Sequence, residues 1–199
     1  MFHPRPYIVG IGGALHLGST TELAIRHAFA GADAELDVFA GADLDLPLYA
    51  AQSPAQTPAV QRLLRALRRA DGVVIGSPGY HGGLSGVVKN ALDYIEFMRD
   101  DERPYLSGRA VGCIANAAGW QGAMSALAAT RNIVHALRGW PTPLGVCLAG
   151  PQKPFDAQGR CTDTVVDRNL RALATEVLQF AQWQRHSAPV MAPRPAKVA

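Results

Sequence analysis

Three short, almost unbroken apolar runs constrain most strongly what this chain can fold into. They are YIVGIGG at residues 7–13, GVVIGS at 72–77 and AVGCIAN at 110–116. Runs of this kind, rich in valine and isoleucine, are typical of strands that are buried on both faces, as in a parallel sheet. Two weaker candidates, AELDVFA at 34–40 and PLGVCLA at 143–149, bring the expected number of strands to five.

Helical periodicity fills the spaces between these strands. Apolar residues recur at spacings of three and four in the segments 21–30, 59–70, 87–98, 122–138 and 164–183. Five strands that alternate with five helices predict an α/β fold, a parallel sheet covered on both faces through right-handed crossovers. Arg62, Arg65 and Arg69 fall outside the apolar stripe of 59–70 and are expected to face solvent.

The length of 199 residues fits one domain with a substantial core. We expect this domain to span residues 1–185. Residues 186–199 are rich in proline and alanine without periodicity, and they are expected to form a tail that is either flexible or draped on a partner subunit. Residues 41–58, a long connection after the second strand, either carry part of a binding site or form a plain surface loop.

Composition argues against nucleic acid or a membrane as the main partner. Nineteen Lys and Arg against 16 Asp and Glu give a net charge of only +3, which leaves room for a small anionic ligand. No segment approaches the roughly 20 apolar residues of a membrane-spanning helix. The glycine-broken run at 7–13 suits a strand better than a secretory signal. Cys113, Cys147 and Cys161 are too far apart for a redox pair or zinc cluster, which favours reduced thiols in a cytoplasmic protein.

In a doubly wound sheet, ligands bind outside the carboxyl ends of the strands, where the strand order reverses. The loop after the first strand, GGALHLGSTTE, ends in three hydroxyl residues, Ser19, Thr20 and Thr21, at the start of a helix, with His16 just before them. Hydroxyls and unpaired N–H groups at a helix N-terminus form an anion site, although a simple N-cap is the alternative. The glycine spacings of nucleoside triphosphate and dinucleotide sites are absent, which favours a mononucleotide phosphate.

The loop after the third strand, SPGYHGG, is the second part of the expected site. Pro78 restricts the backbone, Tyr80 and His81 offer flat rings, and Gly82 and Gly83 allow close approach of a neighbour. This combination suits a planar heteroaromatic ligand; a plain turn with Tyr80 in the core is the alternative.

The loop after the fourth strand, NAAGWQG at 116–122, brings Gly119 and Trp120 to the same edge. Its main-chain donors are placed to meet a ring that becomes negatively charged. The alternative is a Trp120 that is simply packed.

With these residues the chain resembles the NAD(P)H-dependent FMN reductases of the flavodoxin-like superfamily. The most specific match is Pro-x-Tyr-x5-Gly-x2-Lys-Asn-x-Leu-Asp, and the first loop matches Gly-x-Leu-x-x-Gly-Ser; together with the third loop the resemblance covers most of residues 7–180. The residues that carry it are Pro78, Tyr80, Gly86, Lys89, Asn90, Leu92 and Asp93, with Gly13, Leu15, Gly18 and Ser19 in the first loop. Two positions depart from the pattern: His16 stands where arginine or lysine is common, and Gly79 where an acidic residue is common.

The resemblance implies a flavodoxin-like three-layer sandwich with strand order 2-1-3-4-5, and FMN at the reversal between strands one and three. Lys89, Asn90 and Asp93 would be structural and fix the helix after the second loop. The residues implied to bind FMN are His16, Ser19, Thr20 and Thr21 at the phosphate, Pro78, Gly79, Tyr80, His81 and Gly82 along the ring, and Gly119 and Trp120 on its other side.

The resemblance further implies hydride transfer from NADH or NADPH to FMN, with release or onward transfer of reduced FMN, for instance to a flavin-dependent monooxygenase. Such chemistry needs no catalytic side chain, which agrees with six histidines too scattered for a triad or a metal set. The alternatives are a quinone or azo-compound reductase that keeps its FMN, an electron carrier of flavodoxin type, and a fold member that binds no flavin. A homodimer or homotetramer is expected from the family and from LDYIEFM at 92–98, for which ordinary core burial is the alternative.

Overall fold

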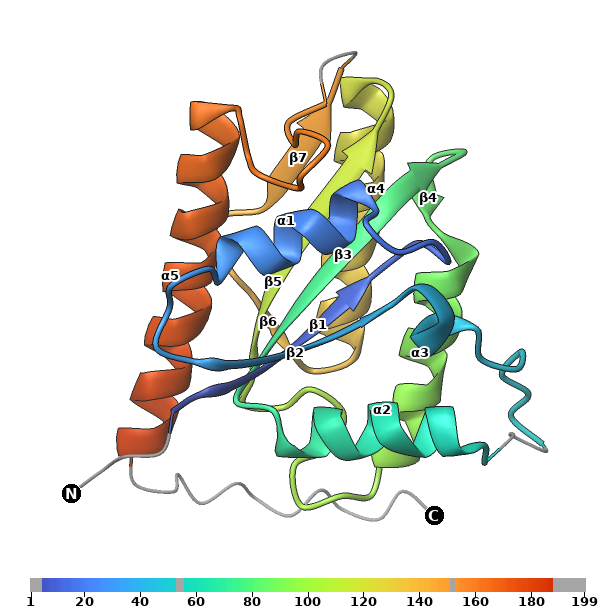
Figure 1. The fold of residues 1–199 in the computed structure, drawn as a ribbon. Helices are drawn as coiled ribbons and strands as arrows, with labels where there is room; N and C mark the ends of the chain where they lie inside the picture. The colour runs from blue at the N-terminus through green and yellow to red at the C-terminus, as the bar shows by residue number, and fades with distance from the viewer. Residues whose placement is uncertain (1–4, 53–55, 151–152, 188–199) are drawn as a thin grey trace.

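The computed structural model describes residues 5–52, 56–150 and 153–187. A parallel sheet runs through the molecule in the order β2(Glu35–Ala40), β1(Tyr7–Gly12), β3(Gly72–Tyr80), β5(Ala110–Ala117) and β6(Trp140–Pro141) (Figure 1). Two further strands complete the seven. β7(Val146–Ala149) pairs parallel with the second half of β5, and β4(Gly83–Leu84) pairs antiparallel with the end of β3.

The five expected strands are confirmed in the order 2-1-3-4-5, with the fifth position divided. β6 pairs with Ala110 and Val111, and β7 pairs with β5 from Ile114 onward. Pro141 and Pro143 have no N–H to donate to a neighbouring strand, which accounts for the break between β6 and β7. Neither β4 nor β6 was expected, because two residues are too few to leave a periodic pattern.

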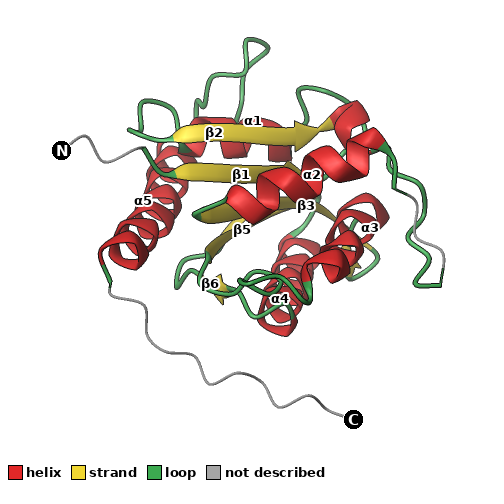
Figure 2. Ribbon diagram, turned by 90° about the horizontal axis from the view of Figure 1, so that it is seen from below, coloured by secondary structure: helices red, strands yellow, loops and turns green. Residues whose placement is uncertain are grey.

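Helices cover both faces of the sheet, as Figure 2 shows. α1(Thr20–Ala28) and α5(Thr164–His186) pack on one face, and α2(Pro58–Arg69), α3(Gly86–Asp93) and α4(Trp120–Ala136) pack on the other. Two short 3-10 helices, η1(Gly41–Leu44) and η2(Tyr94–Met98), follow β2 and α3. The helix expected at 87–98 is therefore α-helical only to Asp93 and tightens in its second half.

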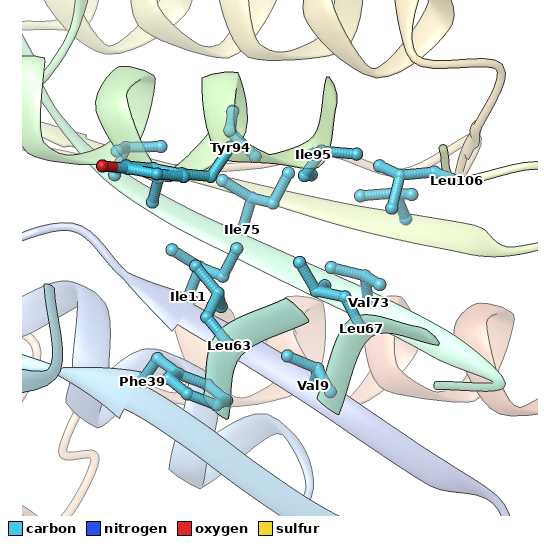
Figure 3. Close-up of a cluster of buried hydrophobic side chains, with 14 of the residues drawn as sticks. Val9, Ile11, Phe39, Leu63, Leu67, Val73, Ile75, Tyr94, Ile95 and Leu106 are labelled. Carbon is cyan, nitrogen blue, oxygen red and sulfur yellow. The ribbon is translucent and has the colours of Figure 1, made fainter. Parts of the chain in front are cut away.

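The larger core cluster lies between the sheet and α2, α3, η2 and α4 (Figure 3). Ile11 and Ile75 from the sheet meet Leu63 and Leu67 from α2, and all four are fully buried. The apolar side chains of 92–98 belong to this same cluster, since Leu92, Tyr94, Ile95 and Met98 are at most 1% exposed. Ordinary core burial, the alternative given for that segment, thus accounts for these four side chains.

The arginines of α2 lie on an exposed face, as expected, and two of them also hold the edge strand β2. Arg62 pairs with Asp37 at 3.2 Å, and Arg69 pairs with Glu35. The guanidinium groups of Arg62 and Arg69 lie over the rings of Phe39 and Tyr7, at 4.5 and 3.9 Å from the ring centres. These contacts cover the outer edge of the sheet with charge, which protects it from pairing with another chain.

All three cysteines are free thiols, and burial raises the pKa of Cys113 to about 12. None of the helices in the described ranges has the length and apolar character needed to cross a membrane. Of the expected tail, the structure describes only His186, the end of α5, and Ser187, its C-cap; residues 188–199 lie outside the described residues.

Candidate functional site

The loops that were expected to form the site meet at the carboxyl edge of the sheet. A groove of about 500 Å³ opens there between the β1–α1 loop, the segment after η1, Tyr80 and the first turn of α3. Its lining residues are Gly13, Ala14, Leu15, His16, Leu44, Asp45, Leu46, Leu48, Tyr80, Ser85, Gly86, Val87 and Asn90. Of the predicted site residues, His16 and Tyr80 line this groove; the others lie at the N-terminus of α1, in the end of β3 and the turn after it, and at the N-terminus of α4.

The β1–α1 loop places its three hydroxyl residues at the N-terminus of α1. Ser19 is the N-cap, and its Oγ accepts a hydrogen bond from the Glu22 N–H at 3.2 Å. The Oγ1 of Thr21 lies 3.3 Å from the same Oγ, so both hydroxyls are engaged and buried. Thr20 is half-buried at the first helical position. The first N–H groups of a helix have no acceptor inside it, which leaves those of Thr20 and Thr21 for an anion at the positive end of the helix dipole.

Glu22 is a member of this loop that the sequence interpretation missed. Its carboxylate is buried, accepts from the Gly18 N–H at 2.9 Å and pairs with Arg26 at 2.9 Å. Ser19 and Glu22 thus form a variant of the capping box, in which the acid bonds one residue earlier than usual. The Ser-x-x-Glu spacing before an apolar helix was the signal in the sequence that predicts it.

The glycine-rich run after β3 forms a tight hairpin rather than an open loop. β3 continues to Tyr80 and pairs with β4 through Gly79–Leu84 and Tyr80–Gly83. His81 and Gly82 make the connection with φ values of 50° and 87°. Positive φ at both central residues is the mark of the type I′ hairpin turn. The hairpin holds Tyr80 at the groove, with 60% of its side chain exposed.

Ser77 and Ser85, which were not predicted, connect this hairpin to the β1–α1 loop. The Oγ of Ser85 donates to the Gly13 carbonyl at 3.0 Å, and its N–H donates to the Oγ of Ser77 at 2.9 Å. Both serines are buried, and Ser85 is also the N-cap of α3. A second link joins the same two loops, because the Gly13 N–H donates to the Gly76 carbonyl at 2.7 Å. The loops therefore form one rigid frame.

The start of α4 packs directly against the hairpin. A Cβ atom built on Gly79 would lie only 2.8 Å from the carbonyl oxygen of Gly122, so this position has no room for a side chain. The absence of an acidic residue at Gly79 is thus tied to the close approach of α4. Gly119 is the N-cap of α4 and offers no side-chain cap, and Trp120, the first helical residue, is 63% exposed.

Asn90 fixes a neighbouring loop rather than its own helix. Its Oδ1 accepts from the Tyr49 N–H at 2.8 Å, and its Nδ2 donates to the carbonyls of Leu46 and Pro47 at 3.2 and 3.0 Å. The segment that forms one wall of the groove is therefore held in place by α3. Leu44, Asp45, Leu46 and Leu48 of the connection at 41–58 line the groove, so part of that connection lies at the candidate site.

Lys89 and Asp93 form an ion pair one turn apart on α3, with Nζ to Oδ distances of 2.6 and 2.8 Å. This pair lies within the helix, as the structural role expected of it requires.

Exposed apolar side chains gather at this edge of the molecule. Leu15, Leu17 and Leu48 are 55, 75 and 85% exposed, in addition to Tyr80 and Trp120. Large apolar groups concentrated around a groove mark a binding site more often than a free surface. The edge thus offers an anion site at the N-terminus of α1 and apolar, aromatic surface beside it.

Comparison with known proteins agrees with this arrangement. The family model described as NADPH-dependent FMN reductase matches residues 6–152. An NAD(P)H-dependent FMN reductase of Pseudomonas aeruginosa is 32% identical over 185 residues, which cover 89% of this chain and 95% of that protein. An FMN-dependent NADPH-azoreductase of Staphylococcus haemolyticus is 29% identical over 67% of this chain and 71% of its own.

Solved structures show the same fold at low sequence identity. RosB, solved with bound 8-demethyl-8-formylriboflavin-5′-phosphate, has a TM-score of 0.73 at 15% identity and matches 98% of this chain and 92% of its own. A flavodoxin, WrbA-like protein of Agrobacterium tumefaciens has a TM-score of 0.59 at 16% identity over 90% of this chain and 99% of its own. The expected flavodoxin-like fold is confirmed, and the chain belongs to the NADPH-dependent FMN reductase family.

Proposed function

We propose that this carboxyl edge binds FMN and that the protein catalyses hydride transfer from NADH or NADPH to it. The observation that carries the proposal is that two helix N-termini, those of α1 and α4, lie at the same carboxyl edge of the sheet as the hairpin that presents Tyr80. One N-terminus suits a phosphate and the other suits a ring that gains negative charge. FMN carries both groups in one molecule.

The residues at α1 fit a phosphate. The N–H groups of Thr20 and Thr21 and the hydroxyl of Thr20 are the donors on offer, with the exposed imidazole of His16 beside them. Ser19 and Thr21 act indirectly, because their hydroxyls are occupied in shaping the helix start. Glu22 keeps Gly18 in its left-handed conformation through the bond to the Gly18 N–H.

The residues around the hairpin fit a flat, mainly apolar ring. Pro78 and Gly79 form the backbone floor, the turn at His81 and Gly82 stays clear of other protein atoms, and Tyr80 and Trp120 supply exposed aromatic surface. Aromatic faces of this kind bind planar heterocycles by stacking. Gly119 leaves the first turn of α4 uncapped, so its N–H groups and the positive end of the dipole are free to stabilise negative charge.

The chemistry that FMN supplies when bound is acceptance of a hydride from the nicotinamide at its N5 position. The contribution of the chain is to hold the ring with one face open to the nucleotide and to place donors where charge develops. Neither task requires a nucleophile or a general base.

Steady-state oxidation of NADH and NADPH, followed at 340 nm with and without added FMN, tests the proposal. We expect turnover that rises with FMN and saturates. Nucleotide oxidation that is indifferent to added FMN, or absent with both nucleotides, would show that the protein does not reduce FMN.

A reductase that retains its FMN and acts on azo compounds or quinones is the second candidate. It is favoured by the azoreductases among the relatives. Purified protein that stays yellow through dialysis and turns over faster with azo dyes or quinones than with free FMN would identify this second function. A flavodoxin-type electron carrier is less well supported. Such carriers usually dock to their redox partners through a strongly acidic surface, whereas this chain has a net charge of +3.

We further propose a cytoplasmic protein in which residues 1–185 form the flavin-binding domain and residues 186–199 a C-terminal tail. A homodimer or homotetramer and delivery of reduced FMN to a monooxygenase belong to the same proposal. What supports them is family membership, the free cysteines and the small net charge.

A further inference from the structure

All three tryptophans of the chain are more than half exposed, which is unusual for so large an apolar side chain. Trp120 belongs to the candidate flavin site. Trp140 and Trp183, 59 and 65% exposed, lie at the amino edge of the sheet, on β6 and near the end of α5. The flavin site explains neither of them.

These two tryptophans and Phe180 form one aromatic patch. The rings of Trp140 and Phe180 are 5.8 Å apart at 39°, and Trp183 follows Phe180 by three residues on the same helix. The surface of α5 around them is uncharged over Val177–Gln184, where the polar side chains are glutamines. Exposed tryptophan is typical of the centre of a binding surface.

We propose that residues 188–199 of the chain bind over this aromatic patch. The described chain ends next to it. Both the N–H and the Oγ of Ser187 donate to the carbonyl oxygen of Trp183, at 2.9 and 2.8 Å. Ser187 itself is extended, with φ −78° and ψ 132°, so the chain leaves the helix at the turn that carries Trp183.

The composition of residues 188–199 suits an aromatic surface. APVMAPRPAKVA contains three prolines, the larger aliphatic residues Val190, Met191 and Val198, and no acidic residue. Proline-rich segments dock on exposed aromatic rings, and a guanidinium such as that of Arg194 stacks on tryptophan. Twelve residues can span about 37 Å, at about 3.1 Å per residue of polyproline conformation, which is ample to pass Trp183 and the Trp140–Phe180 pair.

Hydrogen–deuterium exchange on the full chain, read from peptides covering 188–199, tests this inference. We expect those amides to exchange at least about tenfold more slowly than in an unstructured peptide of the same sequence. In the double variant Trp140→Ala, Trp183→Ala the protection is expected to vanish, whereas in Trp120→Ala it stays. Unprotected amides in the wild-type chain, or protection that survives the double variant, would overturn the proposal.

A second measurement changes the tail instead of the patch, so it does not depend on the folding of the Trp140→Ala, Trp183→Ala variant. In a Trp120→Phe background, acrylamide quenching reports only Trp140 and Trp183. We expect Pro193→Gly, Pro195→Gly to raise the quenching constant about twofold. The alternative occupant of the patch is a second copy of the chain, which light scattering would detect as a dimer. A dimer that dissociates in the Trp140→Ala, Trp183→Ala variant, while the 188–199 amides exchange freely, would assign the patch to that second copy and overturn the proposal.

Discussion

The hydroxyl of Ser85 donates a hydrogen bond to the carbonyl oxygen of Gly13, 3.0 Å away and 72 positions earlier in the chain. This bond joins the loop that begins α1 to the hairpin that ends β3. Because Ser85 also caps α3, a single buried side chain fixes the relative positions of the phosphate end and the ring end of the proposed site. A site organised in advance loses less entropy when its ligand binds.

Ser85→Ala is therefore expected to weaken FMN binding as well as stability. Loss of the cap and of the partner of the Gly13 carbonyl costs about 1–3 kcal/mol of folding free energy, and we expect the Kd for FMN to rise about tenfold. The matched control is Thr57→Ala, which removes the N-cap of α2 away from the site. It is expected to lower stability while leaving the Kd unchanged. Equal Kd values for the two variants would remove Ser85 from the site.

Gly82 offers a test of close approach between the hairpin and the ring. Its φ of +87° strains any other residue, but a Cβ there meets no protein atom within 4 Å. We expect Gly82→Val to destabilise the fold by about 1–2 kcal/mol and to raise the Kd for FMN more than tenfold.

Gly31 has a similar φ of +80° with equally open surroundings and lies after α1, away from the proposed site. Gly31→Val thus reproduces the strain without the obstruction. If both variants bind FMN as the wild type does, the ring does not lie against the hairpin.

His16 is expected to act on the phosphate alone. It lines the groove beside the N-terminus of α1, and no lysine or arginine is present from Gly12 to Ser19. His16→Ala should raise the Kd for FMN about threefold to tenfold and leave the Kd for riboflavin, which lacks the phosphate, unchanged. His16→Arg should tighten FMN binding. A parallel loss for both flavins would place His16 at the ring instead.

Buried strands were the most predictable part of the fold, because burial on both faces leaves long apolar runs such as 72–77. The break between β6 and β7 was not predicted, since it depends on two prolines next to a strand of only two residues. The hairpin at His81–Gly82 was read as an open loop because β4 is equally short.

The loops of the site could be located from topology, but the bonds that hold them could not. Asn90 is 41 positions from Tyr49, and Ser85 is 72 positions from Gly13, so no local pattern connects either pair. Glu22 is different, because the Ser-x-x-Glu spacing was visible in the sequence.

Acid sensitivity is expected where α1 meets α5. A hydrogen bond from His27 is the main cause that lowers the pKa of the Asp167 carboxyl, and a hydrogen bond from Arg171 is the second. A lowered folded pKa means that the carboxylate stabilises the fold above the unfolded value of about 3.9, and that this stabilisation is lost as the pH falls through the folded pKa. Asp167→Asn should lower Tm by about 2 °C at pH 6, with the difference from wild type closing towards pH 3.

Asp100→Asn is the control for this effect, because the side chain of Asp100 is 89% exposed. It is expected to change Tm little at either pH. A difference between wild type and Asp167→Asn that does not shrink as the pH falls from 6 towards 3 would contradict the role of the ionised carboxylate.

FMN is proposed to bind at the carboxyl edge of the sheet, and Trp120 and Trp140, which lie at opposite edges, provide a direct test. Trp120 and Trp140 are similarly exposed, at 63 and 59%, so their replacement by alanine disturbs the fold to a similar, small extent. Titration of FMN, followed by its fluorescence, should give a Kd about tenfold higher in Trp120→Ala than in wild type, from the loss of aromatic stacking. Trp140→Ala should match wild type. Equal affinities in the two variants, or no saturable binding to the wild-type chain, would contradict the account.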